Sequence, residues 1–218
     1  PVTVSVSDGA STASQSFLFT IRPVNDLPTI DAIADLHLNE NSPPHTVSLT
    51  GLSSGAPEEN QTLAVSASSD NQALIANVSV NYQSPASTAT VTFIAVPNTN
   101  GSAAITVNVS DGQSPNSLAS RTFSVFVNAA PTIVDISDQS TLEDTPSAAI
   151  AVTVVDRDGP ADQITVTGTS SNPSLVSDNG IAVQGTGSVR LVVITPITNQ
   201  FGSAIINLRA ADTNGAAT

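Results

Sequence analysis

The chain of 218 residues contains no cysteine, methionine or tryptophan, and its five basic residues are all arginine, so it has no lysine either. Without cysteine it can form neither a disulfide framework nor a thiolate metal site. Aromatic residues make up only 3% of the chain. Valine, isoleucine, leucine and alanine must therefore fill any core, and the β-branched ones among them pack well on a pleated sheet.

Charge is scarce and of one sign. Charged residues make up 11% of the chain and the formal net charge is −13, whereas about a quarter of an average protein is charged. We expect no nucleic-acid partner, because nucleic-acid binding rests on cationic contacts to phosphate. An acidic chain is instead suited to solubility and to hard cations such as calcium.

Signals for a membrane span and for catalysis are also missing from the sequence. No apolar run reaches the roughly 18 residues of a transmembrane helix. There is no Gly-any-Ser-any-Gly elbow and no phosphate loop, and the only histidines, His37 and His45, do not recur in the repeat described next. We therefore predict that the chain is not an enzyme, and we expect no catalytic residues and no zinc site.

What the chain does have is an internal repeat. Pro28-Thr29-Ile30 returns as Pro131-Thr132-Ile133, an offset of 131 − 28 = 103, and Val6-Ser7-Asp8-Gly9 returns as Val109-Ser110-Asp111-Gly112 with the same offset. A period of about one hundred residues is a domain and not a solenoid turn. The repeat predicts the C-terminal strands of a preceding unit over 1–26, a complete unit over 27–128, and a second unit over 129–218 that lacks its last strand.

Each unit shows short runs in which apolar and polar residues alternate between turn residues, the pattern of half-buried strands. About seven such runs per unit predict an all-β fold of tandem Greek-key β-sandwiches. We expect strands at these positions: Val2–Val6, Phe17–Val24, Ile30–Ile33, Val47–Leu49, Leu63–Ala67, Val78–Val80, Val91–Phe93, Ile105–Val109, Phe123–Val127, Ile150–Val154, Ile164–Val166, Ile181–Val183, Val189–Val193 and Ile206–Leu208.

The second unit has no counterpart of the run Phe123–Val127. A sandwich without its final strand exposes open sheet edges, which favour aggregation. We predict that this unit is completed by a strand from outside residues 131–218, either further along the sequence or from another copy by β-augmentation. The expected partners are therefore further repeats of the same chain or other copies of it.

Short acidic motifs recur at the boundaries between units: Asn25-Asp26, Glu40-Asn41-Ser42, Glu143-Asp144-Thr145, Asp156-Arg157-Asp158-Gly159 and Ser110-Asp111-Gly112. In order and spacing the chain resembles the bacterial cadherin-like and immunoglobulin-like tandem repeats of large, adhesin-type surface proteins. The resemblance covers the whole chain. It implies an extracellular or cell-surface location and calcium ions bound at the joints between units.

Calcium takes about six to eight oxygen ligands, which carboxylates and Asn side chains supply. For the second joint we expect the ligands Asp111, Asn128, Glu143, Asp144, Asp156 and Asp158, and for the first joint Asp8, Asn25, Asp26 and Glu40. Each set departs from the family pattern, since the second joint has Ala129 where the pattern has Asp, and the first has Ser53-Ser54-Gly55 in place of paired acids. The alternative is that these residues are solvated turn formers.

The sequence as a whole favours a structural segment of an exported surface or fibre-forming protein, acting as a stalk, a spacer or a filament subunit. Two alternatives stay open. One is a ligand-binding adhesin module, which we would expect to show aromatic and Arg anchors in its loops, and the other is a non-catalytic accessory segment of a large secreted enzyme.

Overall fold

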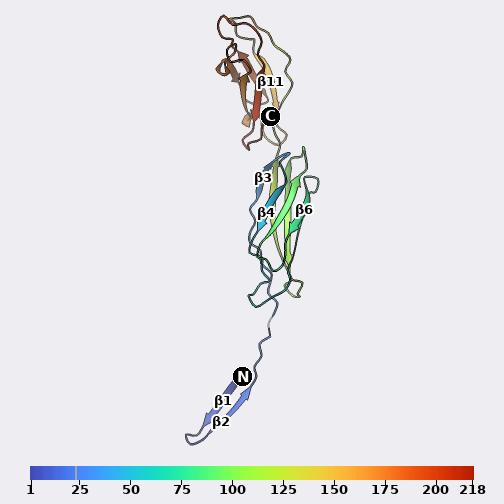
Figure 1. The fold of residues 1–218 in the computed structure, drawn as a ribbon, viewed down its shortest axis with the longest axis vertical. Coiled ribbons are helices and arrows are strands. Elements are labelled where there is room, and N and C mark those ends of the chain that lie inside the picture. Colours follow the sequence, from blue (N-terminus) through green and yellow to red (C-terminus); the bar gives the residue numbers. More distant parts are fainter. Residues whose placement is uncertain (23) are drawn as a thin grey trace.

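A computed structural model of the chain describes residues 1–22 and 24–218 and places three parts end to end (Figure 1). The first part is an antiparallel hairpin of β1 (Val2–Ser7) and β2 (Thr12–Phe17), all of whose residues are exposed. We expected its second strand over 17–24, which is wrong for the part described: β2 covers Thr12–Phe17, and its ladder with β1 runs from the pair Ser7–Thr12 to the pair Val2–Phe17. Pro23, in the same expected range, lies outside the described residues.

The second part, the first complete unit, is a sandwich of two sheets. One sheet has the order β3-β9-β8-β5 and the other the order β4-β7-β6. The parallel pair β3–β9 is the exception among otherwise antiparallel neighbours. The strands are β3 (Leu36–Asn39), β4 (His45–Leu49), β5 (Ala64–Ser69), β6 (Ile75–Asn81), β7 (Ala89–Ala95), β8 (Gly101–Ser110) and β9 (Leu118–Asn128).

Strict alternation positions the core of this unit. In β7 and β8 every second residue is buried, since successive side chains of a strand point to opposite faces. Phe93 and Phe123 are the largest fully buried side chains, and aliphatic residues fill the remaining space. The expected strand at Ile30–Ile33 is wrong: the neighbouring Thr29 forms an isolated bridge with Ser53, the N–H of Asp31 donates to the carbonyl oxygen of Thr50, and the edge strand is β3 a few residues later. Residues 31–35 are exposed or half-buried, so the alternation of buried and exposed positions is not kept there.

The third part, the second unit, repeats this plan with fewer strands. One sheet has the order β10-β11-β14-β13 and the other contains only β12 and β15. Two short 3-10 turns, η1 (Ala161–Gln163) and η2 (Asp178–Gly180), precede β12 and β13. The strands are β10 (Thr132–Ile133), β11 (Ile150–Val155), β12 (Thr165–Ser170), β13 (Ile181–Gln184), β14 (Val189–Ile194) and β15 (Ile206–Ala211).

The core of the second unit contains a buried cation that the sequence pattern did not reveal. Arg190 on β14 is only 4% exposed. It donates hydrogen bonds to the carbonyl oxygens of Ala161 at 3.0 Å and Ile164 at 2.8 Å, and to that of Gly187. Buried charges need such partners, because removal from water disfavours an unpaired charge strongly. Arg190 thereby ties the η1 loop to the sheet.

The predicted fold class, tandem β-sandwich units with immunoglobulin-like architecture, is confirmed by these sheets. Within the residues that the structure describes, no helix is long and apolar enough to cross a membrane. Strand β15 pairs with β12 on one edge only, apart from a single bridge between Ala211 and Ala217. The completion of this unit by an outside strand stays a prediction.

Candidate functional site: the joints between units

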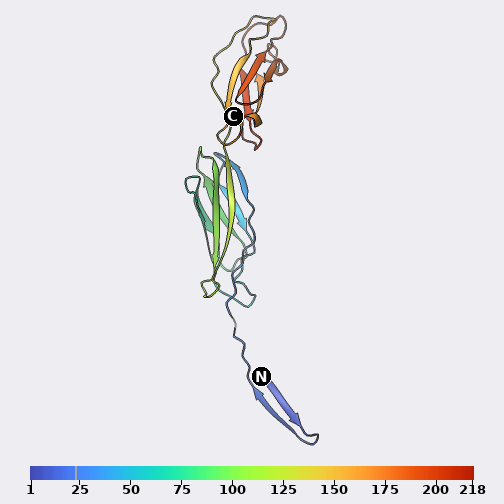
Figure 2. The ribbon, with the colours of Figure 1, turned by 180° about the vertical axis from the view of Figure 1, so that it is seen from behind.

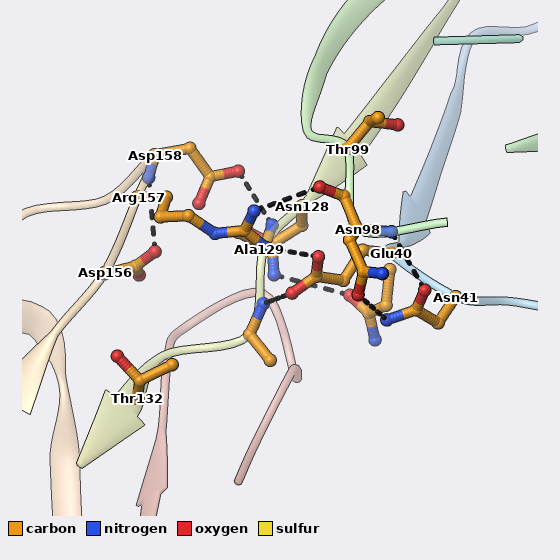
Figure 3. Close-up of polar contacts among 12 residues, drawn as sticks. Glu40, Asn41, Asn98, Thr99, Asn128, Ala129, Thr132, Asp156, Arg157 and Asp158 are labelled. Atoms are coloured by element: carbon orange, nitrogen blue, oxygen red, sulfur yellow. Dashed lines mark hydrogen bonds and ion pairs between the residues drawn. The ribbon is translucent and has the colours of Figure 1, made fainter. Parts of the chain in front are cut away.

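The first and second units meet at a linker of three residues, Asn128 to Ala130, which runs from the end of β9 to Pro131 (Figure 3). Ala129 is fully buried and Pro131 is buried as well. Proline fixes its own φ and restricts the residue before it to extended conformations. The linker is therefore short and packed against protein on both sides.

Asn128 connects the first unit to a loop of the second. Its Nδ2 donates to Asp212 Oδ2 at 2.7 Å, and its Oδ1 accepts from Nδ2 of Asn214 at 2.9 Å. Asp212 also accepts from the backbone N–H groups of Asn214 and Ala216 through Oδ1, which fixes the loop after β15. The amide of Asn128 thus uses both its donor and its acceptor across the joint.

Carboxylates from both units bind the backbone of the linker. The N–H of Ala129 donates to Asp158 Oδ2 at 2.9 Å, and the N–H of Ala130 donates to Glu40 Oε1 at 2.8 Å. Glu40 follows β3 in the first unit and Asp158 follows β11 in the second. Hydrogen bonds to a charged acceptor are stronger than those between neutral groups, so one carboxylate from each unit holds the linker backbone in place.

Arg157 closes the joint directly. Its guanidinium forms an ion pair with Glu40 and donates to the carbonyl oxygen of Asn98 at 3.1 Å, both in the first unit (Figure 3). The Glu40 side chain is 8% exposed and that of Arg157 is 45% exposed. Burial alone would raise the pKa of Glu40, but the hydrogen bonds from Arg157 and Ala130 outweigh it, and the pKa lies below the usual value. The pKa of Arg157 is raised by the same pair.

Acidic residues of the second unit crowd around the linker. The pKa of Asp158 is raised, first by partial burial and then by the neighbouring carboxylates of Asp156 and Asp212, although the N–H of Ala129 acts against the rise. Asp156 also accepts from the backbone N–H of Asp158 at 3.2 Å. The joint therefore holds more negative charge than Arg157 alone neutralises.

The first joint repeats the central contact of the second. Nδ2 of Asn25 donates to Asp111 Oδ2 at 3.1 Å and to backbone carbonyls of the same loop, among them that of Pro115 at 3.0 Å. Asn25 and Asn128 are equivalent in the repeat, as are Asp111 and Asp212. At both joints the linker Asn is thus bound by the loop that joins the last two strand positions of the unit that follows.

The sequence grouped several of these residues at the wrong joint. Asp111 belongs to the first joint and not the second, and Glu40 to the second and not the first. Asp8 lies at the tip of the N-terminal hairpin, where backbone N–H groups of Ala10 and Ser11 bind it and lower its pKa. Glu143 and Asp144 lie after the segment 136–142 of the second unit, away from the linker, and Asp144 accepts from the N–H of Asn199 at 2.6 Å.

The physical reason is that the two ends of a strand lie at opposite ends of a sandwich. Gly101, the first residue of β8, pairs with Val127 next to the linker, whereas Asp111 follows the last residue of that strand. Ten strand residues separate these ends by about 30 Å. Of the expected second set, the structure brings Asn128, Asp156 and Asp158 together; of the first set, Asn25 and Asp26 remain at their joint. Asp212 was missed, although its repeat partner Asp111 had been recognised.

Oxygen ligands are plentiful at the second joint, but they are already engaged. Ala129, Ala130, Arg157 and Asn128 donate to the carboxylates of Asp158, Glu40 and Asp212. In residues 1–22 and 24–218 there is no group of three or more acidic or His side chains placed to hold one metal ion. The carboxylates at this joint are already satisfied by hydrogen-bond donors of the protein, and calcium at this joint stays a prediction.

Comparison with known proteins supports the fold. No protein-family model matches the chain and no curated protein sequence matches it. The chain is similar to the I-band fragment I67-I69 from titin, with a TM-score of 0.56 and 14% identity over 88% of this chain and 63% of the fragment. An E-to-A variant of the same titin domains gives a TM-score of 0.58 and 14% identity over 89% of this chain and 64% of the fragment. The chain thus spans just under two thirds of these fragments.

Identity this low shows a shared fold and nothing finer, namely tandem immunoglobulin-like β-sandwiches. A segment of mouse cadherin-23, EC22-24, gives a TM-score of 0.45 and 16% identity over 89% of this chain and 64% of that segment, which is too low to bear on the fold.

Proposed function

We propose that this chain is a non-enzymatic spacer segment of an exported surface or fibre-forming protein, and that its joints are stiffened by polar contacts of the protein itself. The observation that carries the proposal is the repeated pair of linker Asn and loop Asp, Asn25 with Asp111 and Asn128 with Asp212. A contact kept at equivalent places in two successive joints ties each linker to the unit that follows it.

The second joint supports the same function with further contacts. Glu40 reaches from the first unit to the linker and to Arg157, and Asp158 reaches from the second unit to the linker. Short linkers held from both sides restrict rotation of one unit against the next, whereas relative motion is the default when little contact crosses a domain boundary. The acidic, Lys-free composition agrees with a soluble extracellular segment.

Calcium would add to this stiffness. Its proposed ligands at the second joint are Asp156, Asp158 and Asp212, because Asp156 and Asp212 lie close enough to Asp158 to raise its pKa; these carboxylates would have to move to surround one ion. Arg157 forms an ion pair with Glu40 and therefore competes with any metal ion for the Glu40 carboxylate.

Small-angle X-ray scattering of the full chain tests the proposed stiffness. We expect the wild type to scatter as one extended particle, and the double variant Asn25→Ala/Asn128→Ala to scatter as a broad mixture of bent shapes. Asn81→Ala serves as the matched control, because Asn81 is exposed at the end of β6 and pairs with Thr90 of β7 and not with a linker. A wild type that already scatters as freely jointed units would overturn the proposal.

A further inference from the structure

The chain contains three Asn-Gly steps, which begin at Asn100, Asn179 and Asn214. An asparagine followed by glycine is open to a spontaneous reaction, in which the backbone nitrogen of the glycine attacks the side-chain amide carbon of the asparagine. Glycine permits this attack because it has no side chain to hinder the nitrogen and adopts more backbone conformations than other residues. The reactivity of each step therefore depends on how firmly the fold holds its glycine.

Two of the three steps are held by ordered backbone. Gly180 lies in η2, where its N–H donates to the carbonyl oxygen of Ser177 at 2.8 Å and its own carbonyl oxygen accepts from the N–H of Thr195 at 2.8 Å. Gly101 is the first residue of β8 and pairs with β9, and Asn100 before it is half-buried. Movement of either glycine toward its asparagine side chain would disturb this backbone structure.

The third step, Asn214-Gly215, is not restrained in this way. Both residues are exposed, and apart from the chain neighbours of Gly215 no atom lies within 4 Å of the position that a Cβ there would take. The N–H groups of Asn214 and Ala216 both donate to Asp212 Oδ1. Within residues 1–22 and 24–218, however, the N–H of Gly215 forms no backbone hydrogen bond. The nitrogen of Gly215 is therefore available for the attack.

The side chain of Asn214 is part of the second joint. Its Nδ2 donates to Asn128 Oδ1 at 2.9 Å, beside the bond from Asn128 to Asp212. The turn that contains Asn214 lies at the end of the second unit that faces the first (Figures 1 and 2). While the joint is closed, this bond holds the amide of Asn214 in place. When the joint opens, the amide is free to turn toward the nitrogen of Gly215.

We propose that Asn214-Gly215 is a modification site, at which deamidation makes an opening of the second joint permanent. The nitrogen of Gly215 forms a bond to Cγ of Asn214 and gives up its proton. The bond from Cγ to Nδ2 breaks, and Nδ2 leaves with that proton as ammonia. Water then opens the resulting five-membered ring at one of its two carbonyl groups, which yields aspartate or isoaspartate. The reaction consumes only water.

The product cannot restore the contact across the joint. An ionised carboxylate has no hydrogen-bond donor, so Asn128 Oδ1 loses its partner. The new negative charge also enters a cavity whose lining includes Asp158, and the pKa of Asp158 is already raised by burial and by the neighbouring carboxylates of Asp156 and Asp212. Isoaspartate in addition lengthens the backbone of the turn that Asp212 holds. Each change disfavours closure of the joint.

Ageing of the full chain in mildly alkaline buffer, followed by peptide mapping with mass spectrometry, tests the reaction. Asn179 is the matched control, because it is also exposed and also precedes a glycine. We expect Asn214 to convert about fivefold faster or more, because two backbone hydrogen bonds restrain Gly180 and one side-chain bond restrains Asn214. Asn128→Ala should accelerate conversion of Asn214 about threefold or more and leave that of Asn179 unchanged.

The consequence for the joint is tested with Asn214→Asp, which carries the product side chain from the start. In chelator, this variant and fully aged wild type should both melt below fresh wild type by about 4 °C or more. Asn179→Asp should melt as fresh wild type does. Asn214→Gln keeps an amide that cyclises far more slowly, so its melting temperature should not fall on ageing. Equal conversion of Asn214 and Asn179, or an Asn214→Asp variant that melts as fresh wild type, overturns the proposal.

Discussion

The contact between Asn128 and Asp212 yields a thermodynamic prediction that depends on the joint alone. Asn128→Ala removes two hydrogen bonds across the joint, one to a carboxylate and one to Asn214, and a longer one of 3.4 Å to Asn39 within the first unit. A neutral hydrogen bond contributes about 1 kcal/mol and one to a charged group about 1.5–3 kcal/mol. Since these groups are only partly buried, we expect the free energy of unfolding to fall by about 2 kcal/mol.

Asp212→Ala should cost more, because Asp212 also holds the backbone N–H groups of Asn214 and Ala216 within its own loop. A double-mutant cycle separates the two effects, since the loop contacts are lost in both variants that lack Asp212. The coupling energy between Asn128 and Asp212 should be about 1 kcal/mol, above the few tenths typical of distant sites.

Differential scanning calorimetry with circular dichroism provides the assay. Each kcal/mol lowers the melting temperature of a unit of this size by roughly 4–8 °C. Asn81→Ala, an exposed substitution at the end of β6, should melt as the wild type does. A coupling energy within error of zero would refute the reasoning, because the bond across the joint would then contribute nothing to stability.

Three further predictions address charge at the second joint and in the core. Calcium should raise the melting temperature of the wild type through linkage. Asp156→Ala should remove this rise, and Arg157→Gln should enlarge it by freeing the carboxylate of Glu40. Identical melting with calcium and with chelator in all three proteins would count against calcium binding. The pKa of Glu40 is lowered from about 4.5. The contribution of Glu40 to the free energy of unfolding is therefore present above that value and is lost as the pH falls through the folded pKa. The difference in melting temperature between wild type and Glu40→Gln should shrink in acid, and a constant difference would contradict this. Arg190→Leu should lower the free energy of unfolding by about 2 kcal/mol or more, because it leaves buried carbonyls unpaired, whereas the exposed Arg209→Leu should be near neutral in the same melts.

The strands could be predicted from the sequence because alternation is a local property. The runs at Ile105–Val109 and Phe123–Val127 became β8 and β9, since one buried face with period two leaves little choice of structure. The stretch Ile30–Ile33 failed as a strand because three apolar residues carry too short a pattern, and its polar neighbours bond to the loop at Thr50 instead.

Which residues lie at which joint could be predicted only in part. Residues adjacent to the linker, such as Asn25 and Asn128, were placed correctly. Asp111 and Glu40 were misassigned because repeat offsets do not record which end of the sandwich a loop occupies. Because antiparallel strands alternate in direction, counting the strands before Asp111 and before Glu40 would have assigned each residue to the correct end of the sandwich. Arg157 could not be predicted to lie at the joint, because the first unit has no arginine at the equivalent position.

The central claim is that groups of the protein itself order the joint between the two units. Because the chain has no cysteine, spin labels can be attached at Ser66→Cys on β5 and Thr167→Cys on β12, both exposed. Double electron–electron resonance then measures the distribution of distances across the joint. The account predicts one narrow distribution in chelator that stays at the same mean distance in calcium and broadens in Asn128→Ala. A broad distribution for the wild type in chelator would contradict it.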